Sequence, residues 1–208
     1  MKLEVLNQEG NTTGRHFELP DSIFGVEPNE HAVYLAVKQY NANQRQGTHK
    51  SKERSELSGS TRKLHKQKGT GGSRKGDIKS PTFKGGARVF GPRPRDYSFS
   101  LNKKVKALAR VSALSVKAAK GQIMIIEDLK IDAPSTKSFV QVLKNLKVDN
   151  IKPLIVTGAY DQNVYLSSRN LQKAVVSAAR DLNTYGILNA GKLVFFESGI
   201  KQLVEELN

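Results

Sequence analysis

Cysteine is absent from the sequence, which excludes a disulfide scaffold, a thiolate zinc site and a cysteine nucleophile. Long apolar runs are missing too, because none approaches the ~20 residues with which a helix crosses a bilayer. The N-terminus, Met1 to Leu6, turns polar at once and lacks the apolar stretch of a secretory leader. Hydrophobic residues form only 38% of the chain, so part of it should lack a core. We expect a soluble, cytoplasmic protein with no membrane partner.

Positive charge is what the sequence has in excess, and it is concentrated in one place. Lys and Arg number 34 against 19 Asp and Glu, which gives a formal net charge of +15. Residues 44–95, called the basic segment below, hold 15 of those cations and three acids, so the other 156 residues share a net charge of only +3. This distribution points to a polyanionic partner.

The basic segment is also poor in residues that build a core. It contains nine of the 17 glycines and only seven hydrophobic residues among its 52 positions. So little apolar surface cannot offset the entropy of ordering the chain, and the segment is too long for an ordinary connection. We predict an extended or disordered excursion with a function of its own.

The sequence on either side alternates between strand and helix patterns. A hairpin is predicted from Lys2–Asn7 and His16–Leu19. Short continuous apolar runs predict buried strands at 123–126, 153–158, 174–178 and 192–196. Apolar residues at helical spacing predict helices at 29–43, 102–121, 134–146 and from 198 onward.

This order of elements predicts one globular α/β domain over residues 1–43 and 96–208. Its mostly parallel sheet should be flanked by helices in a Rossmann-like three-layer arrangement. The basic segment, 44–95, is then a long extended loop inserted between the first two helices.

Local signals predict where the helices begin and end. Asn102, Ser135 and Ser198 are expected N-caps, and Gly121 is expected to cap a C-terminus. In the helix after Asn102, one inward stripe is expected from Val105, Leu108, Ser112, Ala113 and Val116.

Enzyme signatures fail in this sequence. Gly71 and Gly76 have the separation of a P-loop, but Asp77 replaces its lysine, and Arg74 replaces the third glycine of a dinucleotide fingerprint. The four histidines show no metal-ligand spacing. Glu127-Asp128 fits a solvated strand end better than a catalytic pair. We expect no catalysis, no cofactor and no metal, with a nucleotide-dependent enzyme as the less favoured alternative.

The composition of the basic segment suits nucleic-acid binding. Cations spaced by glycine and serine can follow a phosphate backbone, and glycine lets the chain pass close to it. Phe83 and Phe90 are suited to stack on unpaired bases, and the prolines at 81, 92 and 94 stiffen the return limb. An extended arm suits packed RNA better than a free duplex. A solvated linker and a DNA-binding or chromatin-like protein are the alternatives.

The candidate RNA ligands are of three kinds. Cations that should neutralise phosphates are Lys50, Lys52, Arg54, Arg62, Lys63, Lys66, Lys68, Arg74, Lys75, Lys79, Lys84, Arg88, Arg93 and Arg95. Glycines that should permit close approach are Gly69, Gly71, Gly72, Gly85 and Gly86. Polar candidates are Gln67, Thr70, Ser73 and Ser80. On the following helix, a second contact or merely a solvated basic face is expected from Lys103, Lys104, Lys106 and Arg110.

The basic segment also carries motifs that resemble a known family. Lys66-Gln67-Lys68-Gly69-Thr70-Gly71 is followed at close spacing by Ser73-Arg74, Ile78-Lys79-Ser80-Pro81 and Phe90-Gly91-Pro92-Arg93-Pro94-Arg95-Asp96-Tyr97. The pattern strongly resembles the signature of the bacterial large-subunit ribosomal protein four family, and the likeness extends along the whole chain. Two departures are Leu64-His65, where many members carry a proline and an aromatic residue, and Gly72-Ser73.

The resemblance implies a structural constituent of the large ribosomal subunit, bound to the ribosome in the cytoplasm. It implies an α/β body on the outer surface of the subunit and a long loop that binds 23S rRNA. The loop tip, expected here near Lys66–Arg74, would help to form the wall of the nascent-peptide exit tunnel, beside neighbouring ribosomal proteins at its constriction. A role in early subunit assembly is also implied. In some bacteria, family members repress their own operon by binding the messenger leader.

Overall fold

The computed structural model describes residues 1–129, 131 and 133–207. Lys130, Asp132 and Asn208, which fall within the globular part predicted over 96–208, lie outside the described residues. The chain divides into two units, named here the body, Met1–Asn41 with Ser100–Asn208, and the extended unit, Ala42–Phe99.

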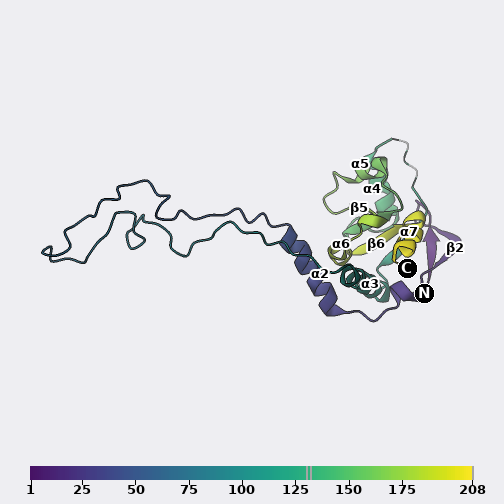
Figure 1. Cartoon of the computed structure of the whole chain (residues 1–208). Coiled ribbons are helices and arrows are strands. Elements are labelled where there is room, and N and C mark those ends of the chain that lie inside the picture. Colours follow the sequence, from purple (N-terminus) through teal and green to yellow (C-terminus); the bar gives the residue numbers. More distant parts are fainter. Residues whose placement is uncertain (130, 132, 208) are drawn as a thin grey trace. The chain divides into compact units, whose positions relative to one another are not determined.

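A six-stranded sheet forms the centre of the body within the described residues (Figure 1). The strands are β1 Lys2–Leu6, β2 Thr12–Glu18, β3 Ile123–Ile126, β4 Pro153–Thr157, β5 Val175–Ala178 and β6 Lys192–Phe196. They lie in the order β2-β1-β3-β6-β4-β5. The β1–β2 pair is an antiparallel hairpin, and the other four pairings are parallel. The α/β class is confirmed, and the sheet is mixed.

Helices cover both faces of this sheet. They are α1 Asp21–Phe24, α2 Glu30–Asn43, α3 Lys103–Ala119, α4 Thr136–Asn145, α5 Gln162–Ser168, α6 Thr184–Asn189, α7 Glu197–Leu207 and the 3-10 helix η1 Ala179–Asp181. Alternate residues of a strand point to opposite faces. In β4, Leu154 and Val156 pack with side chains of α1, α3, α6 and α7, whereas Ile155 packs with α4 and α5.

The central strands are hydrophobic on both faces, as their sequence predicts. All five residues of β4 are buried, and Leu193 and Phe195 of β6 have no exposed surface. Strand β5 lies at the sheet edge, where Val175 is 44% exposed. No helix in the described part of the chain combines the length and the apolarity that crossing a membrane requires.

Two of the expected helix caps are confirmed. Gly121 follows α3 with φ +62°, and the N–H groups of Gly121 and Gln122 donate to the carbonyls of Ala118 and Lys117 at 2.9 and 3.0 Å. This pair of bonds is a Schellman motif, which requires left-handed backbone at the glycine. The Ser135 hydroxyl accepts from the N–H of Ser138 at 3.3 Å and caps α4.

The other two expected caps need correction. Asn102 is the N-cap residue of α3, as predicted, but its side chain accepts no helix N–H. Helix α7 begins at Glu197, one residue before the expected cap Ser198. Asp128 takes the capping role, because its Oδ1 accepts from the Ser198 N–H at 3.1 Å and from the Ser198 hydroxyl at 2.8 Å. The cap comes from the loop after β3, which is distant in sequence from α7, and a local pattern cannot show it.

The predicted helix faces and helix order also need correction. Ser112 and Ala113 of the predicted stripe are buried as expected, but Leu108 is 41% exposed, and the buried residues Ala109 and Leu114 were not expected on the inner face of α3. The short helices α1, α5 and α6 were not predicted. Because α1 precedes α2, the basic segment lies in sequence between α2 and α3 and not between the first two helices.

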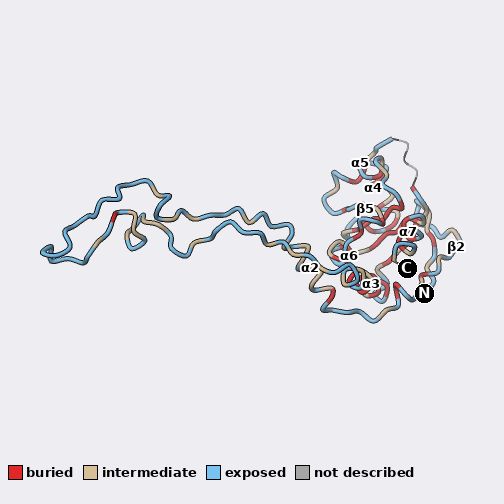
Figure 2. The backbone as a smooth tube through the Cα atoms, in the orientation of Figure 1, coloured by how far each residue is buried: buried red, intermediate tan, exposed pale blue. Residues whose placement is uncertain are grey.

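The extended unit contains two limbs that run beside each other (Figure 1). The limbs carry no helix or strand from residue 44 to 102, a stretch that the structure describes completely. Backbone N–H groups of Leu64, Ala87, Arg88 and Arg95 donate to Gly76, Lys79, Lys52 and Gly47 at 3.1 to 3.2 Å. Figure 2 shows that most of this unit is exposed, and Asp77 is its one buried residue.

Candidate nucleic-acid interface

The cations of the basic segment lie at the surface of the extended unit. Thirteen of the 15 are exposed, and the other two, Lys75 and Lys79, are half-buried. Their charges are therefore accessible to a ligand unless a carboxylate of the protein already neutralises them.

All three carboxylates of the basic segment pair with cations of the same segment. The pairs are Lys50–Glu56, Arg54–Asp77 at 3.0 Å and Arg93–Glu53 at 2.6 Å. The Lys50 ammonium donates to the Glu56 carboxylate, which holds the pKa of Glu56 below its usual range. Three of the candidate phosphate ligands are thus engaged by the protein itself.

The other twelve cations form no ion pair with a carboxylate in this fully described segment, although the charge of Lys52 also contributes to lowering the pKa of Glu56. Four of them contact neutral groups: Arg45 and Arg95 lie over Tyr97, Lys75 lies over Phe83, and Lys63 donates to Gln67. The remaining eight form no side-chain hydrogen bond, ion pair or ring contact there, and they are Lys52, Arg62, Lys66, Lys68, Arg74, Lys79, Lys84 and Arg88. We call these eight the free cations.

Asp77 anchors one point between the two limbs. Its side chain is only 2% exposed, and its Oδ2 accepts from Nε and Nη2 of Arg54, both at 3.0 Å. Its Oδ1 has no hydrogen-bond partner in the structure. A buried carboxylate is costly without a cationic partner, so Arg54 is what permits Asp77 to be buried.

Tyr97 brings two cations together near the ends of the extended unit. The guanidinium groups of Arg45 and Arg95 lie 3.6 and 4.4 Å from its ring centroid. Gly47 passes close by with φ +64°, and a Cβ there would lie 2.1 Å from the Arg95 carbonyl oxygen. Exposed cation–π contacts contribute about 0.5–1 kcal/mol each. These contacts position both arginines and leave their charges unneutralised.

The expected tip, Lys66–Arg74, consists of exposed residues throughout. Gly69 and Gly71 have φ +81° and +66°, which favours glycine, and a Cβ at either would meet nothing within 4 Å. Their backbone is open to a ligand. Gly86 differs, because a Cβ there would lie 1.9 Å from the Ser80 carbonyl oxygen. Glycine is therefore required at position 86 because the turn from Ser80 to Gly86 leaves no room for a Cβ atom.

Other candidates divide between the two units. Thr70, Gly72, Ser73 and Gly85 are exposed in the extended unit, and Ser80 is half-buried with its hydroxyl 3.0 Å from that of Thr82. Lys103 and Lys104 belong to the body, in the first turn of α3, which holds no acid. The helix dipole disfavours cations at this end by about 0.3–1 kcal/mol. Helix stability therefore does not explain these two exposed lysines.

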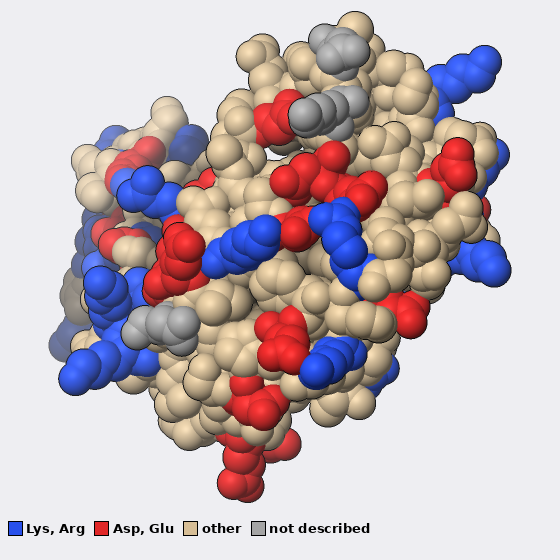
Figure 3. Space-filling model, turned by 90° about the vertical axis from the view of Figure 1, so that its right-hand side faces the viewer, with Lys and Arg blue, Asp and Glu red and all other residues tan. Residues whose placement is uncertain are grey.

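The body carries charges of both signs. Figure 3 shows acidic and basic side chains interspersed on one of its faces. Arg15 pairs with Glu127 and, at 3.2 Å, with Glu197, which also pairs with Lys201 at 3.0 Å. Glu127 and Asp128 are accordingly occupied as an ion pair and a helix cap, and are not a free carboxylate pair.

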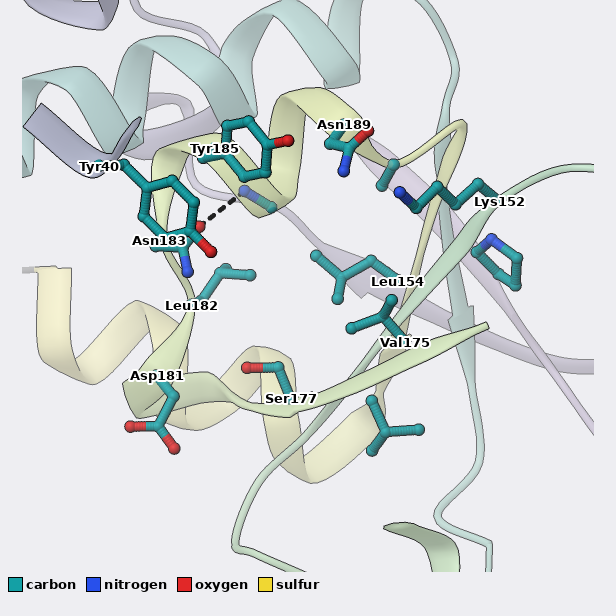
Figure 4. A pocket seen from close by; sticks show the side chains of 14 residues that line it. Tyr40, Lys152, Leu154, Val175, Ser177, Asp181, Leu182, Asn183, Tyr185 and Asn189 are labelled. Atoms are coloured by element: carbon teal, nitrogen blue, oxygen red, sulfur yellow. Dashed lines mark hydrogen bonds between the residues drawn. The ribbon is translucent and has the colours of Figure 1, made fainter. Parts of the chain in front are cut away.

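One cavity of about 280 Å³ lies beside β4, β5 and α6 of the body (Figure 4). Tyr40 and Tyr185 line it with rings stacked at 4.5 Å between centroids and 13° between planes. Lys152 and Asp181 lie at opposite ends, so their side chains form no acid–base pair. Among the residues that the structure describes, no three His, Cys, Asp or Glu side chains are grouped as metal ligands. The site with a distinct chemistry is the basic segment.

Comparison with known proteins agrees with the motifs of that segment. The profile of the ribosomal protein L4/L1 family matches residues 17–206. The chain belongs to this family. The large ribosomal subunit protein uL4 of Phocaeicola vulgatus is 60% identical over 203 residues, which cover 98% of both chains. The proteins of the same name from Parabacteroides distasonis and Christiangramia forsetii are 61% and 58% identical over 200 and 208 residues, or 96% and 100% of both chains.

Membership of the L4/L1 family confirms the resemblance seen in the sequence. Its members are ribosomal proteins, components of a ribonucleoprotein that carries out translation, and not enzymes. Bacterial ribosomes lie in the cytoplasm, so a cytoplasmic, ribosome-bound location follows from the family.

Sequence reasoning missed the internal partners of the basic segment. Glu53 and Glu56 enter the charge count, but no pattern singles them out. Asp77 enters the sequence argument only because it replaces the lysine of a P-loop, and its partner Arg54 lies 23 residues away. A signal did exist for Tyr97, since it follows Arg95 and Asp96 directly in the family motif. Its contact with Arg45 still requires the two limbs to come together.

Proposed function

We propose that this chain is a structural constituent of the large ribosomal subunit and binds 23S rRNA through the basic segment. The observation that carries the proposal is the set of eight free cations on a unit with one buried residue. Phosphate groups can pair with these unpaired cations. Each phosphate that is neutralised releases condensed counterions, and this release favours binding. The paired cations Lys50, Arg54 and Arg93 then help to shape the segment, in addition to any contact with RNA.

The absence of a core in the extended unit gives RNA a second role. A chain of this composition cannot order itself by burying apolar surface. Packed RNA supplies both the counter-charge and the surface on which the limbs become fixed. We propose that the loop orders together with the rRNA, which suits a part in early subunit assembly. Binding to the messenger leader of its own operon would use the same cations.

We place the tip, Lys66–Arg74, in the wall of the nascent-peptide exit tunnel beside neighbouring ribosomal proteins at the constriction. Support comes from its exposure and from the open backbone at Gly69 and Gly71. Lys103 and Lys104 add an rRNA contact from the body. We further propose that the body is Rossmann-like with three layers and that residues 44–95 are a loop inserted in it, which the helices on both faces of the sheet support.

Salt dependence of binding tests the phosphate contacts. For eight phosphates, log affinity for rRNA should fall against log salt with a slope of about −6 to −7, or roughly 10³- to 10⁴-fold between about 50 and 200 mM. Folded large-subunit rRNA should bind more tightly than duplex DNA at equal salt. A nearly flat salt dependence, or equal affinity for both nucleic acids, would contradict the proposal.

The tunnel position is tested separately by crosslinking. Because the chain has no cysteine, Ser73→Cys introduces a single thiol at the expected tip. In assembled ribosomes, a thiol-linked photoprobe at this position should crosslink to a stalled nascent chain. Ser58→Cys, also exposed but outside the tip, is the matched control. Equal crosslinking from both positions, or none from Ser73→Cys, would contradict the proposed position of the tip in the tunnel wall.

A further inference from the structure

We propose that Phe90 is a stacking site for an unpaired nucleobase of RNA, an inference that rests on the proposed rRNA binding and adds a base contact to it. The Phe90 side chain is 98% exposed, the largest exposed fraction among the large hydrophobic side chains that the structure describes. Burying a phenyl group is worth about 1.5–3 kcal/mol relative to leaving it in water. The chain itself obtains none of this free energy from Phe90, so a partner can.

The backbone around Phe90 projects the ring outward. The N–H of Arg88 donates to the Lys52 carbonyl at 3.2 Å, and the N–H of Ser51 donates to the Pro92 carbonyl at 3.0 Å. The two bonded residues of one limb, Ser51 and Lys52, are adjacent in sequence, whereas their partners on the other limb, Pro92 and Arg88, are four positions apart. Residues 89–91 are therefore three extra residues between the two bonds and form a bulge, in which Gly91 lies against Ser51. Phe90 is the middle residue of this bulge.

Close contact between the limbs prevents the ring from folding back between them. A Cβ on Gly91 would lie 2.1 Å from the Ser51 Oγ and 2.5 Å from the Ser51 Cβ. Only a residue without a side chain fits at this crossing. The limbs are thus in contact next to Phe90, and its ring has no space inside the unit.

The charges next to the bulge indicate what kind of partner covers the ring. Lys52 and Arg88, whose backbones pair beside the bulge, are both free cations. A partner that reaches Phe90 must accommodate these two charges. RNA does so with its phosphates while offering the flat apolar face of a base, whereas an apolar protein pocket would have to desolvate both cations.

The second phenylalanine of the segment has a different environment. Phe83 is half-buried, and the Lys75 ammonium lies 5.6 Å from its ring centroid. Its backbone also belongs to a tight turn, in which its N–H donates to Ser80 and its carbonyl accepts from Gly86. Phe83 is already partly covered by the chain. From the sequence, both Phe83 and Phe90 are candidates for stacking, but in the structure only Phe90 is fully exposed.

Fluorescence of a single tryptophan tests the assignment directly. The chain contains no tryptophan, so Phe90→Trp in the full-length protein reports on this position alone. Titration with deproteinised large-subunit rRNA should quench its emission strongly, as stacking on a base does. Phe83→Trp, the matched control, should be quenched less. Fully paired duplex RNA, which offers no unpaired base, should leave the emission of Phe90→Trp nearly unchanged.

Affinity provides the second measurement. Phe90→Ala should weaken rRNA binding about 5- to 150-fold, the fold-change equivalent to about 1–3 kcal/mol per stacked base, without altering the salt slope. If wild type binds with a steep salt slope and Phe90→Ala binds equally well, the stacking site is wrong and the proposed function stands. If Phe90→Ala impairs only incorporation into protein-containing subunits, Phe90 docks on a protein and the inference fails. If wild type shows no salt-dependent binding, the proposed function fails first.

Discussion

Arg54 and Asp77 join the two limbs of the extended unit, with Nε and Nη2 of the guanidinium each 3.0 Å from one carboxylate oxygen. The two residues are 23 positions apart, and Asp77 is the one buried residue of this fully described unit. In this unit an ion pair joins chain segments that are distant in sequence, whereas in the body hydrophobic contacts do so. The pair joins residues of both limbs, so it helps to shape the segment, in addition to any contact of Arg54 with RNA.

Removing the guanidinium should loosen the limbs without affecting the body. Arg54→Gln leaves the Asp77 carboxylate buried without its cation, which is unfavourable. We expect faster hydrogen exchange at the cross-limb N–H groups of Leu64 and Arg88, measured by mass spectrometry, with unchanged exchange in the body. Lys52→Gln, which removes a free cation of the same segment, is the control. Unchanged exchange in Arg54→Gln would show that the pair does not hold the limbs.

Two free cations at the tip should contribute measurably to the salt dependence. The double variant Lys66→Gln/Lys68→Gln removes two predicted phosphate contacts, so the magnitude of the log–log salt slope should fall by about 1.4–1.8. The thermal transition of the body should not move. Lys137→Gln/Lys144→Gln removes the same charge from exposed positions of α4 and should preserve the slope. Equal slope changes in both variants would mean that net charge alone drives binding.

The C-terminal ends of α3 and α4 provide a matched test of backbone conformation. Both helices end in the same pair of bonds, but the left-handed position is Gly121 after α3 and Lys147, with φ 55°, after α4. Gly121→Ala should lower the free energy of unfolding by about 1 kcal/mol, and Lys147→Gly should raise it by about 0.5–1 kcal/mol. Urea unfolding measures both. Changes in the same direction would contradict this interpretation.

Lys117 should make stability depend on pH in the alkaline range. Its Nζ donates to the Ala190 carbonyl at 2.6 Å and to Gln122 at 2.9 Å, and burial, with a smaller effect of Lys120, lowers its pKa below 10.5. Between the lowered pKa and 10.5, the unfolded chain binds more protons than the folded chain, so the free energy of unfolding rises with pH. Measured against Lys117→Met, wild type should gain stability as pH approaches about 10.5. A difference that stays constant with pH would refute the shift.

Much of the body follows from short-range patterns. The run that forms β3 is apolar at every position, and those that form β4 and β6 are apolar except for Thr157 and Lys192 at their ends, as strands in the middle of a parallel sheet require. Gly121 and Ser135 end or begin helices through contacts within a few residues. The short helices α5 and α6 had signals that sequence reasoning overlooked, since Asp161 and Asn183 accept from N–H groups in their first turns.

The remaining features depend on contacts between distant parts of the chain. Asp128 replaces Ser198 as the cap of α7 because β3 ends beside the start of that helix. Leu108 is exposed because α3, which packs against α1 and α6, buries other residues instead, among them Ala109, Ala113 and Leu114. In both cases the local sequence favours one residue for the cap or the buried face, and tertiary packing places a different residue there.

The sequence by itself determined where the charge lies and that the basic segment cannot build a core, because both follow from counting residues along the chain. It also contained the motifs that identify the family. Only the tertiary structure decided which cations are paired and which aromatic ring is uncovered. Arg54 meets Asp77, and residues 89–91 bulge around Phe90, only when two limbs distant in sequence lie together, and no local pattern encodes that pairing.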